Sequence, residues 1–207
     1  MVLWSMEARP LGGWAVFKRL SLTMMDMNRR AQISIVGFNE DSCTKAARDA
    51  AYQVGRAVAR AGGTVICGGL GGVMEAACKG ARDAGGHSVG IIPSADSAQA
   101  NRYYDDVVAT GLGNSRNFLV AYSGDAMVVV GGGAGTLIEV AAAYQADKPV
   151  VTVRGTGGVA DEWGGRYIDH RRTGMILEGS SPEDAVKKVM RVLSRRGKAS
   201  GKTGVAR

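Results

Sequence analysis

The stretch AMVVVGGGAGTLIEVAAAYQA, residues 126–146, decides the fold of this chain because a run of glycines joins a strand to a helix there. Residues 126–130 are all apolar, which is typical of a strand buried on both faces of a parallel sheet. Four glycines within 131–135 predict a tight turn, and the apolar, Ala-rich residues 136–146 predict a helix. The stretch is therefore a predicted strand–turn–helix unit.

Similar units extend in both directions along the chain. Strands are predicted over 33–36, 64–67, 88–92, 107–110, 126–130, 150–153 and 175–177. Helices are predicted over 44–61, 73–84, 114–122, 136–146 and from Pro182 to about Arg196. This alternation predicts an α/β fold with a doubly wound, Rossmann-like parallel sheet sandwiched by helices. Such sheets bind ligands beyond the carboxyl ends of their strands, so we expect the glycine turns after Cys67 and Val130 to build the site.

The length and composition fit one globular domain. The chain has 207 residues, 45% of them hydrophobic, and we predict a single domain over 31–196. Residues 1–30 are expected to be a disordered extension. The alternative is that the assigned translation start lies upstream of the native start. Residues 197–207 are expected to be a basic, disordered tail. The 31 glycines follow no collagen period and are therefore expected to lie in functional turns.

Charge and residue usage exclude several classes of protein. The net charge of +7 arises from the chain ends, because residues 1–30 carry +3, residues 190–207 carry +6 and the middle sums to −2. A nucleic-acid-binding surface on the folded domain is therefore not expected. No run of about 18 apolar residues predicts a membrane span. Three cysteines without a C-x-x-C pair favour a reduced, cytoplasmic setting, and two scattered histidines predict no metal site.

The glycine turn at 131–136 is the main candidate for ligand binding. It lacks the lysine of a Walker A loop and the spacing of the dinucleotide fingerprint. Successive glycines still allow several N–H groups to converge on one anion at a helix start, and a phosphate monoester would fit. The alternative is a turn that only packs the helix closely on the sheet, but four glycines are more than such packing needs.

Two side chains near this turn have alternative interpretations. Thr136 and Glu139 are spaced as a capping box, in which the threonine caps the helix and the glutamate reaches back to it. Glu139 could instead face a bound ligand, hold sugar hydroxyls or stabilise a developing oxocarbenium ion. Arg116, near the start of a short predicted helix, is either a surface residue or a cation of the site.

Residues 131–139, GGGAGTLIE, resemble the P-G-G-x-G-T-x-x-E signature of the LONELY GUY (LOG) family, often labelled "possible lysine decarboxylase". Residues 67–77, CGGLGGVMEAA, resemble the first glycine turn and helix of the same family. The resemblance covers about residues 31–195. It implies enzymes that release the base from nucleoside 5′-monophosphates such as cytokinin ribotides. It also implies a link to the molybdenum-cofactor carrier proteins, which bind a phosphorylated pterin.

The resemblance assigns roles by position. Glu139 matches the catalytic, ribose-binding carboxylate, and Arg116 matches the arginine of an M-H-x-R-K motif. The residues implied to bind ligand or phosphate are Gly69, Gly71, Gly72, Asn117, Gly131, Gly132, Gly133, Ala134, Gly135 and Thr136. The resemblance also implies a homodimer or a higher homo-oligomer, and no required cofactor.

Departures from the pattern separate two hypotheses. The leading proline is Gly131 here, and the M-H-x-R-K motif becomes GNSRN over residues 113–117, so Asn117 replaces its lysine. The variant is closer to the carrier-type branch, which predicts a binding protein for a phosphorylated nucleotide or pterin, molybdenum cofactor among the candidates. The alternative is a nucleoside 5′-monophosphate phosphoribohydrolase, an N-glycosidase. Decarboxylation is not predicted, since no lysine lies in a recognisable pyridoxal-phosphate context.

Overall fold

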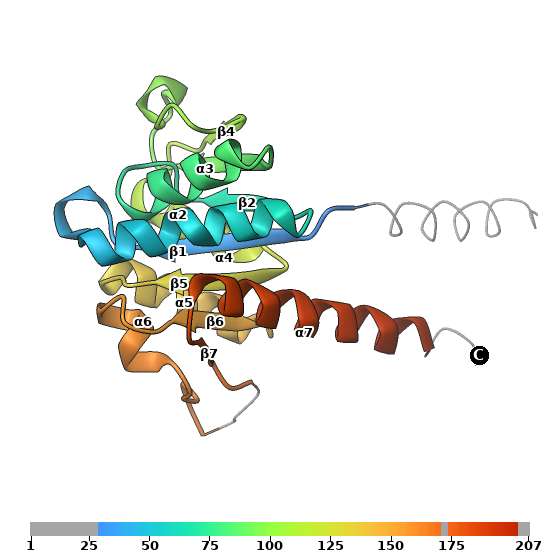
Figure 1. The fold of residues 1–207 in the computed structure, drawn as a ribbon. Coiled ribbons are helices and arrows are strands. Elements are labelled where there is room, and N and C mark those ends of the chain that lie inside the picture. The colour runs from blue at the N-terminus through green and yellow to red at the C-terminus, as the bar shows by residue number, and fades with distance from the viewer. Residues whose placement is uncertain (1–28, 171–173, 203–207) are drawn as a thin grey trace, which may run out of the picture. The chain divides into compact units, whose positions relative to one another are not determined.

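The computed structural model describes residues 29–170 and 174–202 (Figure 1). The strands are β1 (Gln32–Gly37), β2 (Thr64–Cys67), β3 (His87–Ile92), β4 (Asp106–Ala109), β5 (Ala126–Val130), β6 (Val150–Val153) and β7 (Leu177–Gly179). The α-helices are α2 (Lys45–Arg60), α3 (Val73–Asp83), α4 (Arg116–Ser123), α5 (Ala134–Gln145), α6 (Gly158–Trp163) and α7 (Pro182–Lys202). Short 3-10 turns are η1 (Glu40–Ser42), η2 (Ser97–Gln99) and η3 (Gly113–Ser115).

Within these described residues the strands form one parallel sheet in the order β4-β3-β2-β1-β5-β6-β7. The chain first builds outward from β1 to β4 and then returns to add β5 on the other side of β1. In the β1–β5 pair, Ile35 is aligned with Val128 and Gly37 with Val130. The reversal of strand order therefore lies between β1 and β5, which confirms the predicted doubly wound fold.

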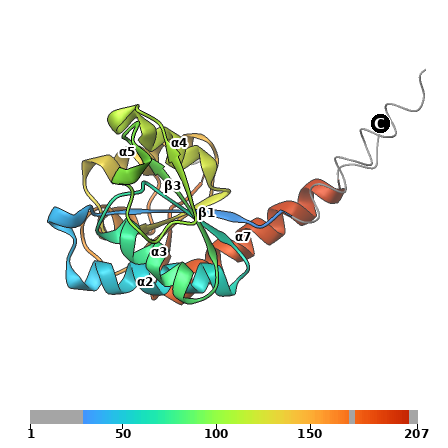
Figure 2. The same cartoon turned by 90° about the horizontal axis from the view of Figure 1, so that it is seen from above.

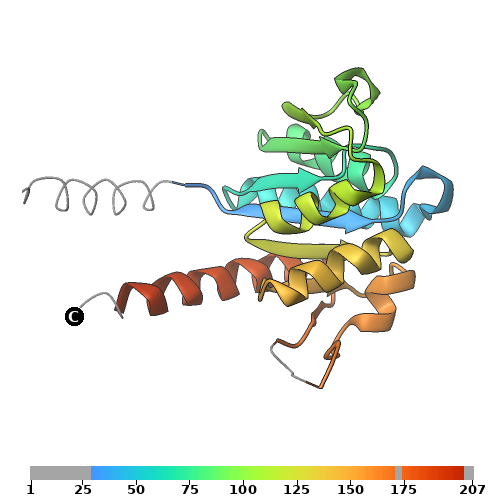
Figure 3. The same ribbon diagram turned by 180° about the vertical axis from the view of Figure 1, so that it is seen from behind.

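Helices cover both faces of the sheet. Figure 1 shows α2, α3 and α7 on one face, and Figure 3 shows α4 and α5 on the other. The view from above in Figure 2 shows the same layers. Successive residues of β5 point to opposite faces: Val128 belongs to the apolar cluster under α2, α3 and α7, whereas Met127 and Val129 belong to the cluster under α4 and α5. Each fully buried side chain of this size stabilises the fold by about 1.5–3 kcal/mol.

Two glycines let helices α2 and α3 pack closely on one another. A Cβ atom at Gly55 would lie 1.9 Å from the carbonyl oxygen of Ala77, and a Cβ at Gly80 would lie 2.0 Å from that of Tyr52. Real Cβ atoms do not approach backbone so closely. Both positions therefore require glycine for the helix spacing, although each glycine lies inside a helix and lowers its intrinsic propensity.

The largest differences from the predicted boundaries are at α4, α5, β7 and α7. Helix α4 begins at Arg116 instead of residue 114, because residues 113–115 form η3. Helix α5 starts at Ala134, two residues before the predicted start at Thr136, because the glycine run itself continues into the first helical turn. The last strand, β7, spans Leu177–Gly179 instead of the predicted residues 175–177. Helix α7 continues to Lys202 instead of ending near Arg196, so the tail predicted to be disordered from residue 197 is helical over 197–202. The predicted extension over residues 1–28 and the tail residues 203–207 lie outside the described residues.

Helix α6 was not predicted. It is only six residues long, and Gly164 and Gly165 directly follow its last residue, Trp163. Its start is stabilised by Asp161, whose carboxylate accepts hydrogen bonds from the backbone N–H groups of Gly155 at 2.7 Å and Gly157 at 2.9 Å. An acidic residue in the first turn of a helix also interacts favourably with the helix dipole.

None of the helices in the described part of the chain combines the length and the apolar composition that crossing a lipid bilayer requires.

Candidate functional site

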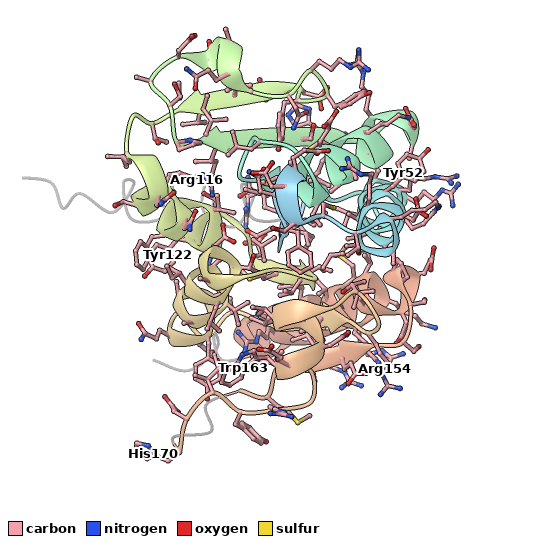
Figure 4. All side chains as sticks on the ribbon, turned by 90° about the vertical axis from the view of Figure 1, so that its left-hand side faces the viewer. Tyr52, Arg116, Tyr122, Arg154, Trp163 and His170 are labelled. Carbon is pink, nitrogen blue, oxygen red and sulfur yellow. The ribbon has the colours of Figure 1, made fainter. Side chains whose placement is uncertain are left out.

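A cavity of about 310 Å³ lies where the strand order reverses. Figure 4 views this edge of the sheet, with Arg116 labelled at the start of α4. The loop after β1, the turn after β2, the start of α4 and the start of α5 all contribute to the wall. The lining residues are Ile35, Val36, Gly37, Phe38, Asn39, Ser42, Gly68, Leu70, Met74, Asn114, Arg116, Asn117, Gly133, Gly135, Thr136 and Glu139. This is the position at which parallel sheets bind ligands.

The amino end of α5 is open toward this cavity. Gly133 is the N-cap residue and supplies no side-chain cap. In the part of the chain that the structure describes, no hydrogen bond is formed by the N–H groups of Ala134, Gly135 and Thr136. The first N–H groups of a helix have no partner within it and carry the positive end of its dipole. The helix start therefore offers donors to an anion, as predicted for the glycine turn.

Of the two alternatives for Thr136 and Glu139, the capping box is excluded by the structure. Thr136 lies inside the first turn of α5, and its hydroxyl donates to the carbonyl oxygen of Gly37 at 3.2 Å, which ties α5 to the end of β1. Glu139 is 6% exposed and lines the cavity instead of reaching back to the helix start. The earlier start of α5 removes Thr136 from the capping position, so the alternative interpretation of Glu139 as a site residue agrees with its location.

Arg116, Asn117 and Glu139 form a buried polar group on one wall of the cavity. Arg116 Nη1 lies 3.4 Å from Glu139 Oε1 and donates a hydrogen bond to Asn117 Oδ1 at 2.5 Å. The guanidinium lies against Gly68, where a Cβ atom would come within 2.6 Å of Arg116 Nη2. Glycine at this position leaves the space that the guanidinium occupies. Of the two alternatives for Arg116, the surface residue is therefore excluded, since the residue is only 7% exposed.

Burial controls the electrostatics of this group. Burial raises the pKa of Glu139 from its ordinary value of 4.5 to about 7, and the neighbouring Arg116 lowers it only in part. Burial also lowers the pKa of Arg116, which Glu139 opposes. Arg116 Nε is buried and has no hydrogen-bond partner among the described residues. A buried, unpartnered donor carries a free-energy penalty.

The raised pKa of Glu139 predicts a pH-dependent stability. Between pH 4.5 and about 7 the folded protein keeps a proton that the unfolded chain has lost, so the free energy of unfolding falls as pH rises through this window. The difference amounts to about 3 kcal/mol. Because Glu139→Gln cannot ionise, urea unfolding should show the variant gaining stability relative to wild type by about this amount between pH 4.5 and pH 8.

Glu162→Gln is the matched control for that series, because Glu162 is exposed and does not line the cavity. Its difference from wild type should stay nearly constant over the same pH range. A constant difference for Glu139→Gln would contradict the raised pKa.

The predicted ligand residues of the second glycine turn divide into two groups. Gly133, Gly135 and Thr136 line the cavity together with Asn117 of α4. Ala134 is exposed in the first turn of α5 and offers its N–H, whereas Gly131 and Gly132 are buried beneath the turn. The Gly131 N–H donates to the Thr156 hydroxyl at 2.8 Å, and the Gly132 carbonyl accepts from the Val159 N–H at 3.0 Å. These two glycines therefore support the turn against α6.

The first glycine turn contributes less to the cavity than its sequence predicts. Gly69, Gly71 and Gly72 do not line it. The N–H of Gly69 donates to the Tyr104 hydroxyl at 3.0 Å, and the N–H of Gly72 donates to Glu40 Oε2 at 2.8 Å. Internal side chains therefore occupy two of the donors that the resemblance assigned to ligand.

The loop after β3 packs on this first turn. The Asn101 N–H donates to the carbonyl oxygen of Gly69 at 3.1 Å, and the Asn101 side chain donates to that of Leu70 at 2.8 Å. No residue of this loop lines the cavity. In this conformation the loop supports the wall of the site and does not cover it.

Sequence reasoning missed the contribution of the loop after β1. Phe38, Asn39 and Ser42 line the cavity. The sequence signal for this loop was Gly37, a glycine at the end of β1. The structure shows why glycine is required there: a Cβ atom would lie 2.1 Å from the carbonyl oxygen of Val130. The close approach of β1 and β5 at this glycine marks the reversal of strand order, but strand order itself cannot be derived from a linear pattern.

Comparisons with known proteins identify the family and similar folds. The model of the SLOG cluster4 family matches residues 30–186. The chain is 31% identical to the molybdenum cofactor binding protein of the phototrophic bacterium Rippkaea orientalis, with a TM-score of 0.71 over 80% of this chain and 98% of that one. The molybdenum cofactor carrier protein of Chlamydomonas reinhardtii is 30% identical, with a TM-score of 0.70 over 80% and 99%. An uncharacterized protein of Archaeoglobus fulgidus is 41% identical over 123 residues, which are 59% of this chain and 80% of that protein.

Proposed function

The chain belongs to the SLOG cluster4 family, and we propose that it is a binding protein for a phosphorylated ligand of the pterin or nucleotide type, with molybdenum cofactor as the leading candidate. The carrier proteins among its structural neighbours support a small-molecule ligand. The observation that carries the proposal is the open start of α5 beside the buried guanidinium of Arg116, whose Nε has no partner among the described residues.

A phosphate fits this combination for electrostatic reasons. The N–H groups of Ala134, Gly135 and Thr136, which have no partner among the described residues, supply directional donors and the positive end of the α5 dipole. Arg116 is buried and adds a full positive charge. Charge-assisted hydrogen bonds are roughly twice as strong as hydrogen bonds between neutral groups. The phosphate would lie between these donors, with the rest of the ligand along the apolar side of the cavity at Phe38, Leu70 and Met74.

Glu139 would bind the polar part of the ligand. Its carboxylate lies 3.4 Å from Arg116 and borders the same cavity. Ionised Glu139 only accepts hydrogen bonds, so sugar hydroxyls or the ring N–H and amino groups of a pterin are suitable partners. Because the pKa of Glu139 is about 7, its carboxyl group is close to half ionised at neutral pH. Ligand groups that donate hydrogen bonds to the ionised carboxylate would lower this pKa and make the ionised form predominant.

The Glu139–Arg116 pair also supports a second candidate function, phosphoribohydrolase activity. In this reaction water replaces the base of a nucleoside 5′-monophosphate, and positive charge develops at C1′ of the ribose in the transition state. Ionised Glu139 would stabilise that charge, and Arg116 would assist at the leaving base. Because the pKa of Glu139 is about 7, the rate would rise with pH through this value.

One experiment separates the two functions. The purified protein is incubated anaerobically with molybdenum cofactor and, in parallel, with AMP. Co-elution of molybdenum and pterin with the protein is measured after gel filtration, and free adenine is measured by chromatography. The proposed carrier function predicts co-elution and no adenine. Adenine release that disappears in Glu139→Gln would establish the hydrolase instead, and absence of both signals would reject the phosphorylated-ligand site.

We further propose that the protein is a homodimer through the outer face of α4 and α5, which Figure 3 shows side by side. The resemblance to the LOG family implies a homo-oligomer, and exposed apolar side chains gather on these two helices. They are Phe118, Leu119, Tyr122, Leu137 and Ile138. Several exposed apolar side chains on neighbouring helices are typical of protein–protein interfaces.

Sedimentation velocity tests the dimer. Wild-type protein should sediment at twice the monomer mass, and Phe118→Glu should shift it to the monomer, because a charge would be buried without a partner. Met175→Glu is the control, since Met175 is similarly exposed but lies outside α4 and α5. A monomeric wild type would reject this interface.

A further inference from the structure

Helices α2 and α7 form a groove on the face of the sheet that they share with α3. Figures 1 and 2 show the two helices side by side on that face. The groove has a volume of about 410 Å³, compared with about 310 Å³ for the cavity of the candidate site. Its lining residues are Gln53, Arg56, Ala57, Arg60, Ala61, Glu183, Val186, Lys187 and Met190. None of these residues also lines the cavity, so the groove is a separate feature of the surface.

The groove has an apolar floor between two basic rims. Ala57 of α2 and Val186 and Met190 of α7 are partly or fully buried and form the floor. Arg60 of α2 and Lys187 of α7 are exposed, so each helix places a cation beside the floor. A ligand for this surface must therefore combine apolar side chains with negative charge on both sides of them.

The positive charge of the rims is not neutralised within the described part of the chain. There, neither the Arg60 nor the Lys187 side chain forms an ion pair or a hydrogen bond. Arg191 and Arg195 follow Lys187 at four-residue intervals, are exposed, and likewise have no carboxylate partner among the described residues. Like charges at this helical spacing destabilise a helix slightly, so the stability of α7 does not explain them. Residues 31–189 sum to −2, so this positive charge is a local concentration.

The groove also lies away from the mouth of the candidate site. Its α2 residues, 53–61, belong to the second half of that helix, and β2 begins shortly after them at Thr64. The groove is therefore near the amino ends of the strands, whereas the cavity lies at their carboxyl ends. A partner bound in the groove would leave the cavity open to its ligand.

We propose that this groove binds an acidic, amphipathic helix of a partner protein. The apolar side chains of that helix would pack on Val186 and Met190, and its flanking carboxylates would pair with Arg60 and Lys187. The phosphates of a nucleic acid would gain nothing from the apolar floor, and a lipid bilayer surface cannot follow a groove between two helices. A second copy of this chain is disfavoured, because a symmetric contact would oppose the same cations of the two copies.

Fluorescence anisotropy with synthetic peptides tests the proposal. The probe is a fluorescein-labelled peptide of about 18 residues, composed of leucine, alanine and glutamate with the leucines along one helical face. The matched peptide has lysine in place of every glutamate. Wild-type protein should bind the acidic peptide at least about tenfold more tightly than the basic peptide, because the rims are positive. Equal affinities, or no binding of the acidic peptide, would overturn the proposal.

Charge reversal locates the binding site. Arg60→Glu combined with Lys187→Glu should weaken binding of the acidic peptide by about tenfold or more, because the rims become negative. Arg102→Glu combined with Arg166→Glu is the matched control, since both arginines are exposed and lie outside the groove. The control reverses the same number of charges and should leave the affinity unchanged. An equal loss in the two double variants would exclude the groove as the binding site.

Two further measurements test the nature of the partner. Met190→Gln should weaken binding of the acidic peptide by about threefold, because the floor loses apolar contact, and an unchanged affinity would contradict the packing of a helix on the floor. A single-stranded thymidine oligonucleotide or anionic lipid vesicles should bind more weakly than the acidic peptide. Tighter binding of either, lost on reversal of Arg60 and Lys187, would overturn the choice of a protein partner. The phosphate site is tested separately by AMP titration, so failure here leaves the proposed function standing.

Discussion

Replacement of Arg116 by alanine is expected to weaken AMP binding by up to about 100-fold, the largest effect on binding of any single substitution in this protein. A hydrogen bond to a charged group contributes about 1.5–3 kcal/mol, and Arg116 is the buried cation of the cavity wall. Lysine at this position should restore only part of the affinity, because an ammonium group cannot reproduce the planar fork of the guanidinium. Calorimetric titration of both variants with AMP measures these differences.

The control for this prediction is Arg102→Ala. Arg102 is exposed, stacks on the Tyr103 ring at 5.1 Å and lies outside the cavity lining. The Arg102→Ala substitution removes the same charge as Arg116→Ala and should leave the affinity for AMP unchanged. A thermal melt of Arg116→Ala checks the fold: Glu139 loses the neighbour that lowers its pKa and is then held more fully in its protonated form, which limits the loss of stability. Wild-type affinity in Arg116→Ala would exclude Arg116 from the phosphate site.

Gly55→Ala is expected to destabilise the fold by about 2–3 kcal/mol, although it adds a single methyl group. That methyl would lie 1.9 Å from the carbonyl oxygen of Ala77, so α2 and α3 would have to separate. The separation would also loosen the reciprocal contact at Gly80, where the backbone of Tyr52 approaches. Overpacking of this kind outweighs the gain in helix propensity, which is only about 1 kcal/mol. Urea unfolding at pH 7 gives the difference directly.

The opposite sign is expected for Gly197→Ala, which makes the same substitution inside α7. Among the described residues outside its own helical turns, no atom lies within 4 Å of a Cβ placed at Gly197, so we expect the propensity gain of up to about 1 kcal/mol to dominate. Comparison of the two variants therefore separates the steric effect at the α2–α3 contact from the intrinsic helix propensity of alanine. Equal effects at both positions would show that the α2–α3 crossing does not require glycine at position 55.

Much of the fold was predictable because each of its units is local. A run of apolar residues such as 126–130, followed by glycines and an Ala-rich helix, carries its own strand and helix signals, and β5 has its predicted boundaries. Helix α2 was predicted with its start at Thr44, whose hydroxyl accepts from the Ala47 N–H at 3.1 Å. Helix α6 was missed because its stabilising contact, from Asp161 back to Gly155 and Gly157, lies outside the hydrophobic periodicity.

The candidate site was predictable only in part. Residues 131–139 were identified from glycine spacing and from the resemblance, and Gly133, Gly135, Thr136 and Glu139 line the cavity as that spacing predicts. The first glycine turn looks equivalent in sequence. Its donors at Gly69 and Gly72 are nevertheless used by Tyr104 and Glu40, residues that are 35 and 32 positions away. No local pattern distinguishes a turn that binds ligand from a turn that binds its own chain.

By itself, the sequence determined the class of this protein: a doubly wound parallel sheet with two glycine turns at strand ends, one of them before α5. These features depend on the properties of neighbouring residues, such as strand and helix propensity, apolar periodicity and the freedom of glycine. Only the tertiary structure decided which donors stay open, that Glu139 pairs with Arg116 instead of capping α5, and that Glu40 occupies the end of α3. Those outcomes depend on burial and on contacts between distant residues, which exist only once the strand order brings β1, β5 and the start of α4 together.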